Sequence, residues 1–146
     1  MKPILLSIMI CFSFFARAQG PSLAEAESYA KKNHKLILLE FSGSDWCIPC
    51  IKMEKEIFQK ESFIKYSKDH LVLVHADFPR LKKHQLPKEQ AERNEKLAEK
   101  YNKEGAFPYT VLLDADGKVL KKWEGLVAAS PEEFISQIQA FTGASN

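Results

Sequence analysis

LILLEFSGSDWCIPC, residues 36–50, is the stretch of sequence that decides the fold of this 146-residue chain. Residues 36–41 form a near-continuous apolar run, which is typical of a central, parallel strand that is covered on both faces. Residues 42–45 are small or polar and predict a loop, and a helix is expected to begin at Cys47 and to run to about Phe58 or beyond. The stretch therefore predicts a buried strand that leads, through a short loop, into a helix.

Helices and strands alternate on either side of this stretch. The first predicted helix opens with the capping-box pattern Ser-Leu-Ala-Glu, and the last opens at Ser130-Pro131. The first helix is expected at 22–32 and two others at 47–58 and 88–102, and strands are expected at 71–76, 109–113 and 119–123. This order predicts an α/β fold in one domain, with a central mixed sheet of four or five strands and helices on both faces. The last two strands form a hairpin around Asp-Ala-Asp-Gly.

The two cysteines of the quoted stretch are the predicted catalytic residues. A helix N-terminus presents free N–H groups and the positive end of the helix dipole, which favour a thiolate at Cys47. Cys50 is one helical turn on, shares a face with apolar residues, and can resolve a mixed disulfide formed by Cys47. We expect Cys47 to be exposed and Cys50 to face inward. Pro49 is tolerated in a first helical turn because its missing N–H has no helical partner there.

Two other interpretations of the cysteine pair remain open at this level. The first interpretation is that the pair forms half of a four-ligand zinc site. The four histidines of the chain lack paired ligand spacing, so no metal and no cofactor is predicted. The second interpretation is that the pair forms an inert structural disulfide, although closing so short a loop adds little stability. The strand–loop–helix context favours redox chemistry over both.

The motif Trp46-Cys47-Ile48-Pro49-Cys50 between a buried strand and a helix resembles the thioredoxin family, over residues 35–141. Phe-Ser-Gly-Ser-Asp-Trp-Cys, with the Lys-Met-Glu-Lys-Glu-Ile-Phe that follows, is similar to exported thioredoxin-like proteins of bacterial envelopes. The resemblance implies a cis peptide bond before Pro108 and substrate contacts at Phe107 and Pro108. It also implies that Trp46 packs beside the site.

The resemblance leaves the role of Glu40 open. Glu40 is the only charged residue among residues 36–41. Either its side chain lies beneath the cysteines, where burial raises its pKa and lets it accept the Cys50 proton, or it turns toward solvent or a lysine.

The first eighteen residues predict a secretory signal peptide, which leaves residues 19–146 as the thioredoxin-like domain. Lys2 precedes an apolar run of 12 residues, and Ala16-Arg17-Ala18 is a small-x-small cleavage site. The alternative, a membrane anchor, needs about 20 apolar residues. Without Lys2 and Arg17, 19 of the chain's 21 basic residues remain against 19 acidic residues, so the charge gives no indication of nucleic-acid binding. The protein is therefore expected to be periplasmic or secreted.

Taken together, these features predict a monomeric thiol–disulfide oxidoreductase that acts on protein thiols and disulfides. The resemblance implies a reductase supplied by a membrane-bound or soluble thiol donor, and the absence of His between the cysteines favours a low reduction potential. A disulfide oxidase or isomerase is the nearest alternative, and a non-catalytic client- or metal-binding module is a further one. Residues 77–87 predict an irregular connection, either a partner-selecting element or a surface insertion.

Overall fold

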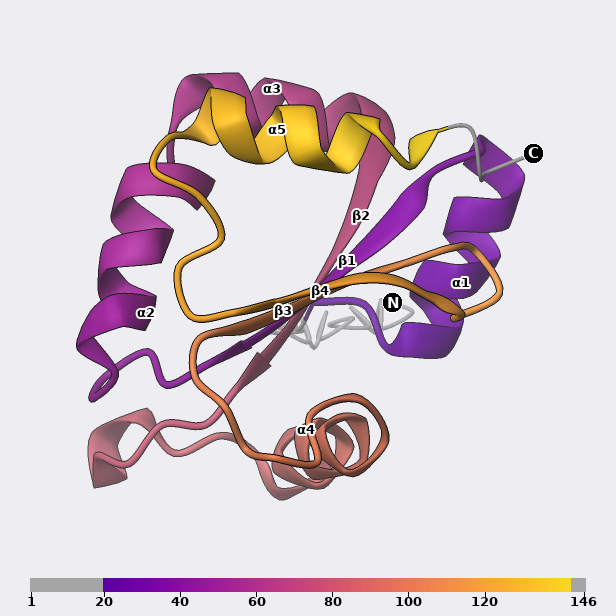
Figure 1. The fold of residues 1–146 in the computed structure, drawn as a ribbon. Helices are drawn as coiled ribbons and strands as arrows, with labels where there is room; N and C mark the ends of the chain where they lie inside the picture. The colour runs from indigo at the N-terminus through magenta and orange to yellow at the C-terminus, as the bar shows by residue number, and fades with distance from the viewer. Residues whose placement is uncertain (1–19, 143–146) are drawn as a thin grey trace, which may run out of the picture.

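Four strands form one mixed sheet in the order β2-β1-β3-β4 in the computed structural model, which describes residues 20–142 (Figure 1). Strand β1 is parallel to β2 and antiparallel to β3, and β3 and β4 form the predicted hairpin. The expected parallel pairing and central position of β1 are therefore confirmed, and the sheet of the described residues has four strands. The strands are β1 (Leu36–Ser42), β2 (Leu71–Asp77), β3 (Tyr109–Leu113) and β4 (Val119–Glu124).

Helices cover both faces of this sheet. On one face lie α1 (Leu23–Asn33) and α4 (Lys88–Tyr101). On the other lie α2 (Ile48–Met53), the π-helical segment η1 (Glu54–Phe58), α3 (Glu61–His70) and α5 (Pro131–Gln139). Figure 1 shows α3 and α5 side by side on one side of the sheet and α4 on the other.

Successive side chains of β1 point alternately to the two faces of the sheet and so contribute to the hydrophobic core on each face. Ile37, Leu39 and Phe41 pack with α1 and α4, whereas Leu36 and Leu38 pack with α2, α3 and α5. Because both faces of the strand are buried, the sequence reads as a continuous apolar run rather than an alternating one. Trp123 is buried in this second core beside Phe134.

The helical crossover between β1 and β2 differs from its prediction in two ways. The helix expected from Cys47 to Phe58 forms, but its second half, η1, is π-helical. A separate helix, α3, then follows after a break at Gln59 and Lys60. Its polar pattern made it hard to separate from the preceding helix by periodicity, because its buried residues are only Phe63 and Ser67.

The connection from β2 to α4 is mostly irregular, as expected, and contains one 3₁₀ turn, η2 (Lys82–His84). The predicted signal peptide, residues 1–18, lies outside the described residues. Within residues 20–142, no helix has the length and apolar character needed to cross a membrane.

Candidate active site

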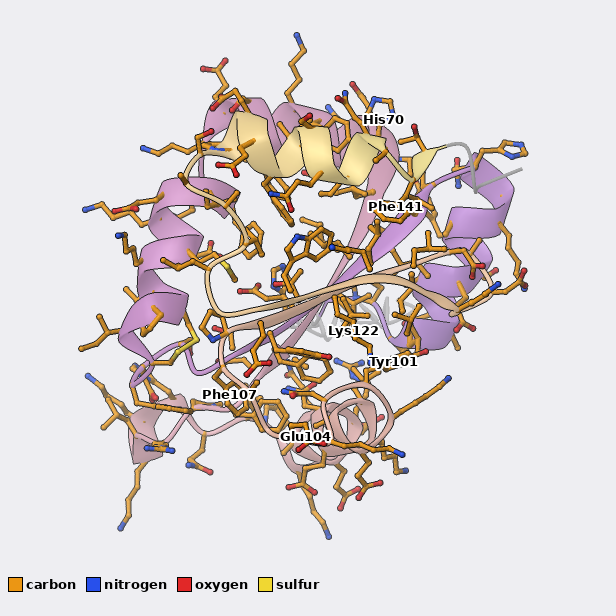
Figure 2. The ribbon with its side chains drawn as sticks, in the orientation of Figure 1. His70, Tyr101, Glu104, Phe107, Lys122 and Phe141 are labelled. Atoms are coloured by element: carbon orange, nitrogen blue, oxygen red, sulfur yellow. A yellow bond between two sulfur atoms is a disulfide. The ribbon has the colours of Figure 1, made fainter. Side chains whose placement is uncertain are left out.

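Cys47 and Cys50 are joined by a disulfide at the start of α2, seen as the yellow bond in Figure 2. The two Cα atoms are 5.2 Å apart. Cys47 is the N-cap residue of α2, and its Sγ accepts a hydrogen bond from the backbone N–H of Cys50 at 3.3 Å. Pro49 occupies the first turn, as predicted. The helix thus begins directly after the reactive residue, and the N–H of Cys50 is directed at its sulfur.

The prediction that Cys47 is exposed is wrong. Its residue surface is only 4% exposed, compared with 1% for Cys50. The loop folds back on itself, because the N–H groups of Trp46 and Cys47 both donate to the carbonyl oxygen of Gly43. Cys47 therefore lies within the turn, and Ile48 protrudes from it with 79% of its surface exposed. The inward position of Cys50 is confirmed, since Met53 and Ile57 on the same face are also buried.

A cavity of about 630 Å³ behind the disulfide connects Cys50 with Glu40. Glu40 is 3% exposed, and burial raises the pKa of its carboxyl group. Its Oε2 lies 2.8 Å from Nδ1 of His75 on the neighbouring strand. The side chain is therefore neither solvent-facing nor bonded to lysine among the described residues, and it lines the same cavity as the inner cysteine.

His75 is a residue of this site that was not singled out from the sequence. The parallel register places it directly beside Glu40, and both line the cavity with Cys50. Its hydrogen bond to Glu40 raises the pKa of the imidazole, against the opposing effect of burial. A signal was present, because His75 is the only titratable residue in the predicted strand 71–76. The pairing itself needed the register of β1 against β2.

Trp46 packs beside the site, as predicted. Its Nε1 donates to the carbonyl oxygen of Phe78 at 2.8 Å, and the Arg80 guanidinium lies 3.6 Å from its ring centroid. A Cβ atom on Gly43 would overlap this ring, so residue 43 must lack a side chain for Trp46 to pack as it does.

The peptide bond between Phe107 and Pro108 is cis, as the resemblance implied. Pro108 immediately precedes β3, which pairs with β1. Phe107, labelled in Figure 2, makes edge-to-face contacts with Trp46 and Phe78, with centroids 5.5 Å apart in each pair. These contacts place the cis-proline segment against the tryptophan of the cysteine loop.

Asp45 links the cysteine loop by hydrogen bonds to the connection that follows β2. Its carboxylate accepts hydrogen bonds from the backbone N–H groups of Arg80 and Leu81, both at 2.9 Å, and lies 3.0 Å from Nδ1 of His84. The bond from Arg80 is the largest cause of its lowered pKa. The irregular connection is therefore fixed to the residues that precede Cys47.

Comparison with known proteins agrees with this arrangement. The family model described as "Thioredoxin-like domain" matches residues 23–142. The chain is 40% identical over 125 residues to the disulfide bond reductase DsbH of Chlamydia pneumoniae, covering 86% of this chain and 73% of that protein. A solved structure of a DsbH oxidoreductase superposes with a TM-score of 0.76 at 37% identity, over 86% of this chain and 84% of that one.

A thioredoxin from Thermus thermophilus shares the fold, with a TM-score of 0.58 at 17% identity over 82% of this chain and 85% of that one. The matched residues include every described strand, the cysteine pair and the cis-proline segment. The chain belongs to the thioredoxin-like family.

Proposed function

We propose that this protein is a thiol–disulfide oxidoreductase that reduces disulfides of other proteins outside the cytoplasm. The observation that carries the proposal is the bonded Cys47–Cys50 pair at the start of α2 in a thioredoxin-like fold. A disulfide bond reductase is among the relatives that match most of the chain, which supports the reductive direction.

The chemistry follows from the position of the two sulfurs. In the reduced protein, the Cys47 thiolate attacks one sulfur of a client disulfide, and the second client sulfur leaves and takes up a proton. Cys50 then gives up its proton and attacks Cys47, which releases the first client sulfur as a thiol. Two electrons pass to the client, and the protein is left with the disulfide seen here. A dithiol donor, membrane-bound or free, restores the reduced form.

Glu40 is proposed to accept the Cys50 proton in the second step. It shares the cavity with Cys50, and burial brings its pKa upward, toward the range in which a carboxylate is an effective base near neutral pH. Its bond to His75 keeps the carboxylate oriented within the cavity.

Three further residues are proposed to support the reaction. Phe107 and Pro108 offer a surface and backbone groups for the client segment beside Trp46. Pro49 holds the first turn of α2, in which Cys50 follows Cys47.

Export is part of the proposal. Residues 1–18 carry the basic start, the apolar run and the Ala-x-Ala site of a secretory signal, whose removal leaves residues 19–146. A dithiol donor is then needed on the far side of the membrane, because that compartment favours disulfides.

A covalent trap tests the proposal. Cys50→Ser removes the resolving thiol, so we expect client proteins to stay linked to Cys47 through a bond that dithiothreitol releases. The matched control, Cys47→Ser with Cys50→Ser, leaves neither thiol and should trap nothing. If both variants recover the same proteins, the exchange mechanism is wrong.

The reduction potential separates the reductase from the oxidase or isomerase. Equilibration of the wild-type protein with glutathione should give a value near that of thioredoxin, about −270 mV. A value near −120 mV would instead make the protein an oxidant and overturn the reductive direction.

A further inference from the structure

The connection between β2 and α4 carries a concentrated positive charge beside the cysteine loop. Residues 79–87, here named the basic loop, contain Arg80, Lys82, Lys83 and His84 and no acidic residue. All four side chains are exposed. Within the part of the chain that the structure describes, no carboxylate lies within ion-pair distance of Arg80, Lys82 or Lys83. These three charges are therefore available to a partner.

The basic loop is fixed to the active site rather than free at the surface. Asp45, two residues before Cys47, accepts hydrogen bonds from the backbone N–H groups of Arg80 and Leu81. Arg80 is stacked on Trp46, the residue next to Cys47, at 3.6 Å from the ring centroid. Figure 1 shows this connection beside the loop in which α2 begins. A client whose disulfide reaches Cys47 must therefore pass close to the basic loop.

Apolar surface is also gathered at this place. Of the six large apolar side chains that are exposed in residues 20–142, Ile48 and Ile51 come from the start of α2 and Leu81 from the basic loop. A cavity of about 380 Å³ lies between the basic loop and α4, lined in part by Trp46, Phe107 and Leu86. The site thus offers apolar contacts, with the positive charges of the basic loop on one side.

Carboxylates lie near the basic loop, but none lies within it. Asp45 is 3.0 Å from His84 and offsets one positive charge, which leaves Arg80, Lys82 and Lys83 without an ion pair among the described residues. Asp77 lines the cavity and accepts hydrogen bonds from Ser44 and from the N–H of Phe78. Glu95, on α4, is the remaining carboxylate of the lining. The positive charge therefore lies over the basic loop rather than over α4.

We propose that the basic loop is a docking element that selects client segments with acidic side chains next to the disulfide. The inference rests on the proposed reductase function and adds the class of client to it. Acidic side chains would lie over Arg80, Lys82 and Lys83, while apolar neighbours of the client cysteine contact Ile48 and Leu81. Complementary charge of this kind acts mainly on the rate of association and on the choice of partner.

Three cystine peptides test the proposal. They share one sequence and differ only in two residues that flank the disulfide, which are Glu, Gln or Lys. The second-order rate of reduction by the reduced wild-type protein is divided by the rate with dithiothreitol at about 1 M salt, where the charge of its reacting thiolate is screened, so that differences in the intrinsic reactivity of the peptides cancel. At about 0.01 M salt, where the screening length is about 30 Å, we expect the Glu peptide to react about tenfold faster than the Gln peptide. At about 1 M salt the difference should nearly vanish.

Paired variants assign the effect to the basic loop. Lys82→Gln with Lys83→Gln should remove most of the preference for the Glu peptide while leaving the rate with the Gln peptide within about twofold. The control, Lys65→Gln with Lys68→Gln, removes the same charge from exposed positions of α3, on the opposite face of the sheet, and should keep the preference.

The outcomes separate the two proposals. Equal normalised rates for the three peptides with the wild-type protein would overturn the docking proposal and leave the reductase function intact. An equal loss of preference in both double variants would also overturn it, since net charge alone would then explain the effect. Failure to reduce any peptide would overturn the reductase function itself, and the docking proposal with it.

Discussion

The carboxylate of Glu40 is buried in the sheet, and its one hydrogen-bond partner among the described residues is His75. Its Oε2 lies 2.8 Å from His75 Nδ1, and the two side chains share a cavity with Cys50. Glu54 from η1 and Asp77 from β2 add negative charge around the pair. A buried acid of this kind holds its proton more tightly than an acid in water, because desolvation disfavours the charged form.

Replacing Glu40 by Gln should slow the release of clients rather than their capture. Gln is similar in shape and can accept a hydrogen bond from His75, but it cannot take the Cys50 proton. Removal of a positioned base costs about 100-fold in rate. Acid quenching and mass spectrometry should show the mixed disulfide accumulating during insulin reduction. Glu40→Asp, which restores a carboxylate, should recover part of the rate, whereas an unchanged rate in Glu40→Gln would exclude the base role.

The same pair should make the oxidised protein less stable as the pH rises. The pKa values of Glu40 and His75 are both raised above their ordinary values of 4.5 and 6.5, so the folded protein binds more protons than the unfolded chain. Stability is then lost as the pH rises through the folded-state values. Between about pH 5.5 and 8, above the titration range of ordinary carboxylates, the free energy of unfolding should fall more in the wild type than in Glu40→Gln.

Urea unfolding of the oxidised protein measures this slope without titrating thiols. Glu104→Gln removes an exposed carboxylate and should retain the wild-type slope. Parallel slopes in the wild type and Glu40→Gln would contradict the assigned direction of both shifts.

At the scale of elements, the loop between β1 and α2 depends on a residue without a side chain. Gly43→Ala should force the Trp46 ring away, since the new Cβ would overlap it. The hydrogen bond to Phe78 and the stacking of Arg80 should weaken together. Insertion of one carbon into a packed site costs about 1–3 kcal/mol, measurable by urea unfolding. Gly20→Ala, which meets no atom within 4 Å, is the matched control and should change stability little.

The sequence was sufficient to predict elements whose signals are local. The apolar runs of β1 and β2, the cysteine motif and the cap at Ser130 each lie within a few residues, and all form as predicted. The helix α3 was missed because it buries only Phe63 and Ser67, which gives a weak periodic signal. Contacts between distant segments, such as Asp45 with Arg80 and Glu40 with His75, required the register of β1 against β2.

At the scale of the whole molecule, an aromatic cluster joins the helices on one face of the sheet. Phe134 of α5 is fully buried and stacks on Phe63 of α3, with centroids 5.8 Å apart, and contacts Trp123 of β4 edge-on at 5.1 Å. Phe58 completes the cluster. The cluster thereby connects the crossover helices to the C-terminal helix.

Phe134→Ala should therefore destabilise the protein by about 3–5 kcal/mol, through the lost burial and the cavity that remains. Thermal and urea unfolding measure the change. Ile64→Ala, on the exposed side of α3, should cost less than about 1 kcal/mol. Equal losses in the two variants would show that the cluster contributes nothing beyond ordinary helix packing.

The order β2-β1-β3-β4 leaves β4 as an outer strand of the sheet formed by residues 20–142. Lys121 and Lys122, both exposed, lie at its middle on opposite faces. Like charges on such a border repel the same border of another copy. This pair of lysines should therefore disfavour pairing of β4 with β4 of a second copy.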